Sequence, residues 1–370
     1  MKSFDAVVAG AGAFGSWTAL SLRRTGRRVL LLDAHGPGNS RSSSGGETRL
    51  IRMAYGADEI YTRWAMRSLG LWTALFREVG KPELFQKTGV LFTPRAGDPR
   101  TGETQAALEK NGVAFRLLPP GDMARTFPQF RFREKREGLF EPESGVLLAR
   151  RAVRAVVEQA IREGVEYREE PAPVIDVSGD PSGVTVYACG PWLPKIFPDV
   201  LGGRIRPTRQ EVFFFGTPPG DPSFAPPHMP AWADITDEHS AYSVPDIENR
   251  GFKLAFDRHG PAFDPDSDDR VARDIEPARA FLGERFPVLA GAPVVESRVC
   301  QYENTSTGDF LIDRHPDFKN VWLVGGGSGH GFKHGPAMGE HVCGLIEGRV
   351  APEPRFALET KTREARRAVF

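Results

Sequence analysis

The fold is decided by residues 4–33, which read FDAVVAGAGAFGSWTALSLRRTGRRVLLLD. This stretch predicts a strand, a glycine turn, a helix and a second strand, in that order. Residues 6–9 (AVVA) and 29–32 (VLLL) are short apolar runs of the kind that form strands buried on both faces. The chain therefore starts with a βαβ unit, and we expect the remaining elements to be arranged around it.

The glycine turn has the GxGxxG spacing of a dinucleotide-binding unit. Gly10 allows a sharp turn, Gly12 lets the backbone approach a pyrophosphate, and Gly15 lets helix and strand pack closely. Asp33 closes the second strand, where it is placed to accept hydrogen bonds from a ribose diol. An acid there argues against a 2′-phosphate, so FAD or NAD is favoured over NADP. The alternative is a tight turn with an incidental aspartate, but the flanking strand and helix favour the dinucleotide.

Composition limits the class of protein. The 370 residues allow one large or two medium domains. Lys+Arg and Asp+Glu balance at 48 each, which predicts neither nucleic acid nor a membrane as a partner. No apolar run approaches ~18 residues, and we recognise no signal peptide. The three cysteines, Cys189, Cys300 and Cys343, are odd in number and far apart, unlike a disulfide framework. We predict a cytoplasmic protein and assign no metal site.

A long polar loop follows Asp33. Residues 34–56 are rich in Gly and Ser, and SSSGG at 42–46 alone would suit a flexible surface excursion. Loops of this length in compact domains usually line a site. Arg49 and Arg52 are three residues apart, and on a helix they would share one face, which indicates anion binding.

The rest of the chain alternates between helical and strand patterns. Apolar spacing predicts helices over 59–79, 148–163 and 274–286, and strands over 88–93, 183–188, 211–215, 241–244, 251–256, 295–302 and 321–324. We interpret 263–272 as a solvated acidic loop. The alternation predicts two interleaved domains and a tail: a dinucleotide-binding domain of residues 1–85, 145–203 and 309–352, a substrate domain of 86–144 and 204–308, and a peripheral tail of 353–370.

Motifs late in the chain make the prediction more specific. Residues 299–305 (VCQYENT), 310–316 (FLIDRHP) and 329–333 (GHGFK) follow in that order after the glycine turn and 48–52 (TRLIR). Together they resemble the monomeric sarcosine oxidase and N-methyltryptophan oxidase group of the D-amino-acid-oxidase-like FAD oxidoreductases, over nearly all of residues 4–350. The resemblance implies an α/β (α+β) fold, with a Rossmann-like FAD-binding domain interleaved with a mixed or antiparallel-sheet substrate domain. It also implies a monomer.

On the cofactor side, the resemblance matches Cys300 to a cysteine that is bonded covalently to FAD, since a thiolate is a nucleophile. The alternative is a buried thiol that acts as a small hydrophobe, which is how we interpret Cys189 and Cys343. The GHGFK loop would wrap the pyrimidine edge of the flavin, and it would also cap the last helix. The full set of expected cofactor contacts is Gly10, Ala11, Gly12, Ala13, Phe14, Gly15, Asp33, Ser43, Ser44, Thr48, Arg49, Val174, Gly190, Cys300, Gly327, Gly329, His330, Gly331, Phe332 and Lys333.

On the substrate side, the resemblance matches Arg52 and Lys333 to two cations that hold a substrate carboxylate. Lys253 matches a lysine that promotes the reaction with O2 beside the flavin. The alternative is a lysine that is merely solvated on the polar face of its strand. Tyr242 and Tyr302 match tyrosines that line the substrate pocket.

Two departures from the family pattern concern the substrate. The family has a histidine four residues after the oxygen-activating lysine, where this chain has Asp257. A carboxylate there would attract a cationic amine. The family also commonly has histidines before the Thr–Arg pair, where this chain has Ser44 and Gly45. These departures argue against sarcosine itself and leave the cofactor and the carboxylate clamp unchanged.

The sequence therefore predicts an FAD-dependent oxidase of a secondary or N-methyl amine that bears a carboxylate. Hydride transfer to flavin N5 would be followed by reduction of O2 to H2O2 and by hydrolysis of the imine. The alternative is a dehydrogenase of the same fold that passes electrons to a quinone or a carrier protein. A third interpretation is a flavin-containing binding protein without turnover.

Overall fold

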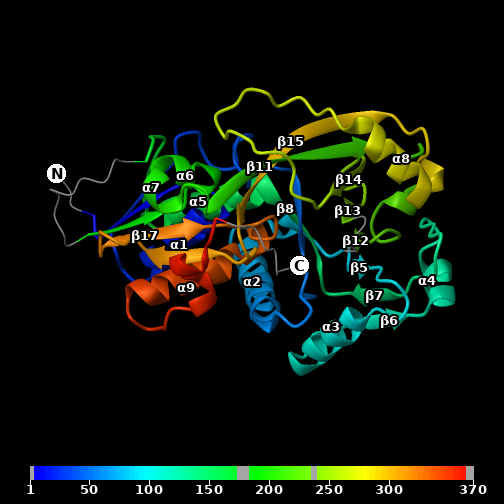
Figure 1. The fold of residues 1–370 in the computed structure, drawn as a ribbon, viewed down its shortest axis with the longest axis horizontal. Helices are drawn as coiled ribbons and strands as arrows, with labels where there is room; N and C mark the ends of the chain where they lie inside the picture. Colours follow the sequence, from blue (N-terminus) through cyan, green and yellow to red (C-terminus); the bar gives the residue numbers. More distant parts are fainter. Residues whose placement is uncertain (1–3, 173–182, 235–239, 364–370) are drawn as a thin grey trace.

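The computed structural model describes residues 4–172, 183–234 and 240–363. It confirms a mixed α/β fold whose two large sheets lie side by side, one at each end of the molecule (Figure 1). Among the described residues, no helix is long and apolar enough to cross a membrane.

The first sheet is built around the predicted βαβ unit. Its order is β16-β17-β10-β1-β2-β9, and every neighbouring pair is parallel except β16 and β17. Ala6 of β1 lies opposite Val29 of β2 and Val184 of β10, so β1 is central and buried, as its apolar run requires. The strands are β1 (Ala6–Ala9), β2 (Val29–Leu32), β9 (Glu166–Arg168), β10 (Val184–Tyr187), β16 (Leu311–Arg314) and β17 (Val321–Gly325).

The helices on this side pack around the helix of the βαβ unit. Helix α1 (Ala13–Arg24) packs against α5 (Ala149–Arg162) and α9 (Gly335–Ile346), and α2 (Glu59–Glu78) packs against α9. The predicted helices over 59–79 and 148–163 are confirmed, because apolar residues recur along one face of each. The other α-helices are α3 (Pro99–Lys110), α4 (Pro120–Thr126), α6 (Leu193–Ile196), α7 (Pro198–Leu201) and α8 (Ile275–Arg285). Short 3₁₀ turns cover η1 (Pro82–Leu84), η2 (Gly190–Trp192), η3 (Pro222–Phe224), η4 (Pro287–Leu289), η5 (Phe332–His334), η6 (Pro354–Phe356) and η7 (Leu358–Thr360).

The second sheet has the order β15-β11-β14-β13-β12-β5-β7-β6, and only β12 and β5 run parallel among its described strands. Its two longest strands, β15 and β11, pair from Ile205 opposite Thr305 to Phe215 opposite Val294. This pair reaches from the first sheet to the far end of the second, which joins the two halves (Figure 1). The strands are β5 (Val90–Phe92), β6 (Arg116–Leu118), β7 (Gly138–Glu141), β11 (Ile205–Phe215), β12 (Ala231–Asp234), β13 (Ala241–Val244), β14 (Phe252–Phe256) and β15 (Val294–Thr305).

A small third sheet corrects the interpretation of Arg49 and Arg52. It has the order β3-β8-β4, with β3 (Thr48–Ile51), β4 (Phe85–Gln86) and β8 (Gly145–Leu148). Residues 48–51 pair with β8 in antiparallel register, so the prediction of a shared helical face was wrong. In a strand, residues three apart point to opposite sides. Arg49 lies on β3 and Arg52 just after its end, and both line the chamber described below.

Two further segments differ from their predictions. The acidic loop 263–272 is tied down, because Lys195 Nζ lies 2.8 Å from Asp264 Oδ1 and Trp192 Nε1 donates to Asp266 Oδ1 at 2.6 Å. The first residues of the tail 353–370 are not peripheral. Phe356 is fully buried, and Arg355 Nη2 lies 2.8 Å from Asp58 Oδ1. The domain boundaries stay a prediction.

Candidate active site

The glycine turn brings three strand ends together. Gly10 has a φ of 101°, and a Cβ there would lie 2.4 Å from the carbonyl oxygen of Ala188 at the end of β10. A Cβ on Gly15 would lie 1.8 Å from Gly10 O. Gly12 differs, because it lines the neighbouring cleft and a Cβ there would make only ordinary contact, 3.4 Å from Ser44 Oγ. The backbone at Gly12 is thus left open to a ligand.

Asp33 lies at the end of β2, beside this turn. Its Oδ2 accepts a hydrogen bond from Ala11 N at 2.7 Å, and its Oδ1 accepts one from His35 N at 2.9 Å. Burial raises the pKa of Asp33. Two backbone bonds hold the carboxylate at the rim of the cleft, which is where a ribose diol is expected.

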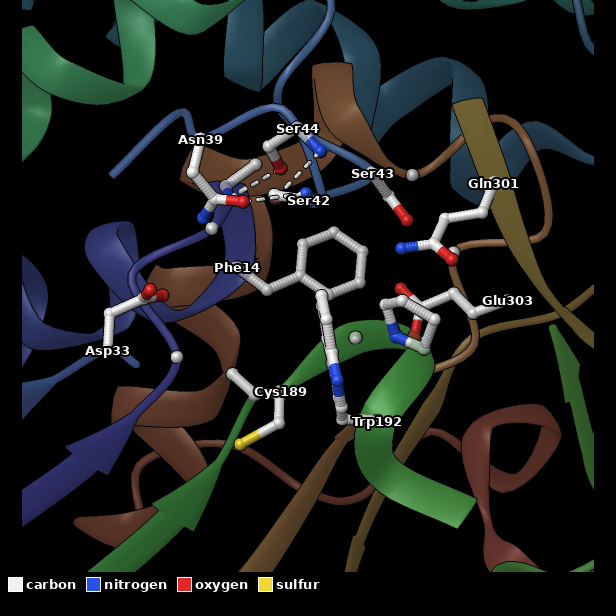
Figure 2. A pocket seen from close by; sticks show the side chains of 18 of the residues that line it. Phe14, Asp33, Asn39, Ser42, Ser43, Ser44, Cys189, Trp192, Gln301 and Glu303 are labelled. Atoms are coloured by element: carbon white, nitrogen blue, oxygen red, sulfur yellow. Dashed lines mark hydrogen bonds between the residues drawn. The ribbon is translucent and has the colours of Figure 1, made fainter. Parts of the chain in front are cut away.

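The polar loop after Asp33 is ordered and forms a wall of this cleft. Asn39 Oδ1 accepts hydrogen bonds from the backbone N–H groups of Arg41 and Ser42, both at 2.9 Å. Figure 2 shows Asn39 beside Ser42 and Ser44. Ser44 Oγ accepts a hydrogen bond from Ala13 N at 3.0 Å, at the first turn of α1. The loop therefore caps the helix whose N-terminal amides face the cleft.

The cleft has a volume of about 300 Å³ and runs along the carboxyl ends of the first sheet. Three buried side-chain oxygens among its lining residues have no hydrogen-bond partner in the described part of the chain: Ser43 Oγ, Gln301 Oε1 and Glu303 Oε2. Buried polar atoms without partners are rare and call for a ligand or water. An open glycine backbone, a helix N-terminus and unpaired acceptors together fit FAD.

At one end of the cleft, Arg49 contacts the predicted cofactor cysteine. Arg49 Nη2 lies 3.4 Å from Cys300 Sγ, and it donates to Ser43 O at 2.7 Å. Its guanidinium carbon lies 5.9 Å from the centre of the Phe332 ring. Although burial opposes the charge, the neighbouring thiol of Cys300 raises the pKa of Arg49. The guanidinium is thus a permanent cation beside the thiol.

Lys253 lies on β14 and is buried rather than solvated, with 2% of its surface exposed. Its Nζ donates to Thr48 O at 3.0 Å and to Thr48 Oγ1 at 3.2 Å. Burial, and then the charge of Arg49, lower the pKa of Lys253 to about 7. The Lys253 amine is therefore held between β14 of the second sheet and β3 of the third, and the solvated alternative is wrong.

A second chamber opens beside the Cys300 end of the cleft. It has a volume of about 80 Å³ and shares Arg49, Tyr302, Gly329 and Phe332 with the cleft. The Tyr302 hydroxyl donates to Asp257 Oδ1 at 3.1 Å, so Asp257 belongs to the chamber wall. Tyr242 lies on the neighbouring strand β13 and bonds to Tyr302. Burial raises the pKa values of both phenols, which keeps them neutral.

Two buried cations meet in this chamber, Arg52 and Lys333. Lys333 Nζ donates to the Tyr55 hydroxyl at 2.8 Å and to His330 O at 2.9 Å. The guanidinium carbon of Arg52 lies 4.1 Å from the centre of the Tyr55 ring. Burial, and then the charge of Arg52, hold the pKa of Lys333 well below its usual range. Both effects disfavour the ammonium form and would be relieved by an anion.

The structure brings most of the predicted site residues together. Phe14, Gly190, Gly327, Gly329 and Gly331 line the cleft, and Val174 lies outside the described residues. Cys189 also lines the cleft, but burial raises the pKa of its thiol to about 12, and Cys343 is a buried residue of α9. Both fit the structural interpretation given to them.

Sequence reasoning missed three residues of the site. Glu141 is fully buried and accepts hydrogen bonds from the backbone N–H groups of Met53 and Ala54, which fixes the chain after Arg52. Tyr55 positions Lys333, and Glu303 lines the cleft. Tyr55 follows the end of β3 in a stretch without regular structure, so no periodicity marked it. Glu141 and Glu303 resemble ordinary surface acids in the sequence.

Comparison with known proteins places this geometry in a family. The sequence matches the family described as DAO, FAD dependent oxidoreductase, over residues 5–345. It is 31% identical to monomeric sarcosine oxidase of Bacillus sp. (strain B-0618), with 92% of each chain covered. It is 27% identical to N-methyl-L-tryptophan oxidase of Salmonella arizonae, with 91% of this chain and 93% of that protein covered.

A solved structure gives the same fold. L-proline dehydrogenase from P. horikoshii superposes with a TM-score of 0.82 at 20% identity, over 99% of this chain and 100% of that chain. The family match spans most of the chain and includes both the cleft and the chamber. The chain belongs to the DAO family of FAD-dependent oxidoreductases.

Proposed function

We propose that the protein is an FAD-dependent oxidase of secondary or N-methyl amines that bear a carboxylate. The observation that carries this proposal is the pair of buried cations, Arg52 and Lys333, in a small chamber that adjoins the cofactor cleft. The relatives named for sarcosine and N-methyl-L-tryptophan support the same class of substrate.

Arg52 and Lys333 would orient the substrate by its carboxylate. The carboxylate restores charge balance to Lys333, whose pKa is lowered by burial and by Arg52. A charge-assisted bond of this kind contributes roughly 1.5–3 kcal/mol. The Tyr55 hydroxyl accepts a hydrogen bond from Lys333 Nζ, and the Trp72 indole donates to Lys333 O at 3.0 Å. The clamp is therefore rigid before the substrate arrives.

Asp257 would act on the amine end of the substrate. Its carboxylate lies on the wall of the same chamber and accepts a hydrogen bond from Tyr302. A carboxylate there favours substrates that arrive with a cationic amine. The chamber then presents two cations to the carboxylate and one anion to the amine, which matches an amino acid at both ends.

Lys253 would act in the oxygen half of the reaction. When bound, FAD supplies the hydride acceptor and, once reduced, the electrons that convert O2 to H2O2. In its protonated form, Lys253 would place a positive charge between Thr48 and the ring of Tyr242, whose centre lies 5.2 Å from Nζ. A fixed cation stabilises superoxide as it forms. The oxidised amine leaves as an imine, which water hydrolyses.

The main experiment is anaerobic mixing of the purified flavoprotein with a panel of N-methyl, cyclic and primary amino acids, followed by flavin absorbance. We expect bleaching by one or more members that bear a carboxylate, and none by matched amines without one. Arg52→Met should raise KM for the active substrate by about tenfold or more. If no member of a broad panel bleaches the flavin, the substrate class is wrong. Bleached enzyme that does not consume O2 would make the protein a dehydrogenase.

Cys300 is proposed to hold FAD covalently. Its sulfur lies 3.4 Å from Arg49 Nη2, at the end of the cleft where the flavin is expected. Acid precipitation tests this directly: yellow colour should stay in the pellet and should be lost in Cys300→Ala. Colour that passes wholly into the supernatant would make Cys300 a structural cysteine.

We also propose a monomeric, cytoplasmic enzyme. All three cysteines are free thiols, which supports a reducing compartment. Chromatography with light scattering would test the monomer.

A further inference from the structure

Glu303 is a buried acid that the proposed chemistry does not use. It lies on β15 three residues after Cys300, and only 7% of its surface is exposed. Glu303 Oε2 has no hydrogen-bond partner, and no lysine or arginine pairs with this carboxylate among the described residues. Burial raises the pKa of Glu303 to about 7, although hydrogen bonds from the backbone N–H groups of Gly327 and Gly326 act in the opposite direction.

The position of Glu303 in the cleft is well defined. A Cβ built on Gly325, at the end of β17, would lie 3.1 Å from Oε2, and one on Gly190, after β10, would lie 3.9 Å from it. Asp33 lies at the end of β2, on the other side of β1 and its glycine turn. Figure 2 shows the two carboxylates on opposite sides of Phe14, with Gln301 beside Glu303. They flank the turn that is expected to face the pyrophosphate.

The chemistry of FAD restricts what Glu303 can meet. A carboxylate oxygen that lacks a partner needs a hydrogen-bond donor, and leaving it unpaired in a buried site costs roughly 1–3 kcal/mol or more. The pyrophosphate offers only acceptors. The donors of FAD are the ribose hydroxyls, the ribityl hydroxyls, the adenine amino group and the flavin N3–H.

The position of Glu303 along the cleft decides which of these donors it can reach. Asp33 is at the adenosine end, and Arg49 with Cys300 marks the flavin end. Glu303 follows Cys300 on the same strand but faces the first sheet, since residues 301 and 303 point opposite to 300 and 302. It therefore lies between the turn and the flavin end. The ribityl chain is the part of FAD that joins the pyrophosphate to the flavin ring.

We propose that Glu303 accepts a hydrogen bond from a ribityl hydroxyl of FAD. Asp33 and Glu303 then have the same task on opposite sides of the glycine turn, each holding a polyol next to the pyrophosphate. The bound hydroxyl supplies the donor that Oε2 lacks. Glu303 is a cofactor-positioning residue in this arrangement and takes no part in hydride transfer.

The test uses the Cys300→Ala background, so that FAD can be removed and added back. Apoprotein is titrated with FAD by flavin fluorescence, with and without a change at Glu303. Glu303→Gln keeps an acceptor and should bind FAD within about threefold of the parent. Glu303→Leu, of similar size but apolar, should bind at least tenfold more weakly.

Three FAD analogues sharpen the assignment, with a hydroxyl removed at ribityl position 2′, 3′ or 4′. The parent should bind one of these analogues more weakly than it binds FAD. With that analogue, Glu303→Leu should bind no more weakly than the parent does. If Glu303→Leu weakens the binding of FAD and of all three analogues by the same factor, Glu303 stabilises the protein and does not contact a ribityl hydroxyl. Unchanged FAD binding in Glu303→Leu would also overturn the proposal. Asp33→Asn is the matched control, because its loss should be the same for every ribityl analogue. If Glu303→Leu does not fold, as judged by thermal unfolding of the apoprotein, Glu303→Ala takes its place.

Discussion

The two ends of the cleft are built in different ways. The nucleotide end is made of backbone: Gly10, Gly12 and Gly15 lie within one turn, and Asp33 follows on the next strand. The flavin end is made of side chains from distant segments, with Arg49 on β3, Lys253 on β14, Cys300 on β15 and Lys333 on η5. A local backbone motif can be predicted from sequence spacing, whereas a constellation of side chains exists only after the fold has formed.

The largest effect is expected at the nucleotide end, where no side chain can be accommodated. Gly15→Ala places a Cβ 1.8 Å from Gly10 O, so β1 and α1 must separate. We expect about 3 kcal/mol or more of lost unfolding free energy and no FAD in the purified protein. Thermal unfolding and the absorbance spectrum measure both.

Gly70→Ala is the matched control for this substitution. Gly70 lies in α2, and a Cβ there would have no atom within 4 Å. This variant should gain roughly 0.5–1 kcal/mol, because alanine is favoured over glycine inside a helix. A Gly15→Ala protein that is as stable and as yellow as Gly70→Ala would contradict the account of the turn.

The next effect is expected at the flavin end and should be confined to one half-reaction. Lys253→Met removes the cation held by Thr48 while preserving most of the side-chain volume. Reoxidation by O2 should slow by about 100–1000-fold, and anaerobic reduction by substrate should change only a few-fold. Stopped-flow absorbance separates the two steps. Equal slowing of both would mean that Lys253 supports the site as a whole and has no special role with oxygen.

The same difference between local motifs and distant contacts decides which parts of the fold could be predicted from the sequence. The βαβ unit and helices α2 and α5 were predictable because their residues repeat at the period of the element. Strands β7 and β8 were missed, because each has only four residues and pairs with strands from earlier parts of the chain, β7 in the second sheet and β8 in the third. Helix α3 has a recognisable start signal in the sequence, because Asp98 caps it and Pro99 begins it.

The candidate site shows the same limit. Asp33 could be placed from spacing alone, but Lys253 depended on resemblance, since a lysine on a strand is usually solvated. Its burial against Thr48 is a product of the contact between β14 and β3, which no local pattern encodes. Glu303 was missed for the same reason. Its carboxylate lies beside Gly325 and Gly190, two residues that are distant from it in the sequence.

A third effect concerns the stability of the apoprotein and depends on pH. Burial raises the pKa of Glu303 to about 7 from its ordinary value of 4.5, so the folded state holds a proton that the unfolded state has lost. Stability should therefore fall as pH rises from 4.5 through 7, by up to roughly 3 kcal/mol. Glu303→Gln in FAD-free Cys300→Ala protein should remove this decline. Urea unfolding at pH 5 and pH 8 measures it, and parallel pH profiles for the two proteins would show that Glu303 does not titrate in this range.

The smallest effect tests a contact between the acidic loop 263–272 and the nucleotide end. Asp266, in the acidic loop, accepts a hydrogen bond from Trp192 and pairs with Lys195. Lys195 and Trp192 hold the pKa of Asp266 below its ordinary value of 3.8, so this contribution is present at neutral pH and is lost as pH falls below that value. Since the pair is half exposed, Asp266→Ala should cost less than about 1 kcal/mol. It should weaken FAD binding slightly, because Trp192 lines the cleft. Asp122→Ala, which breaks an exposed pair with Arg125 on α4, should leave FAD binding unchanged. If the two variants bind FAD equally well, the nucleotide end does not depend on the acidic loop, and its contrast with the flavin end becomes sharper.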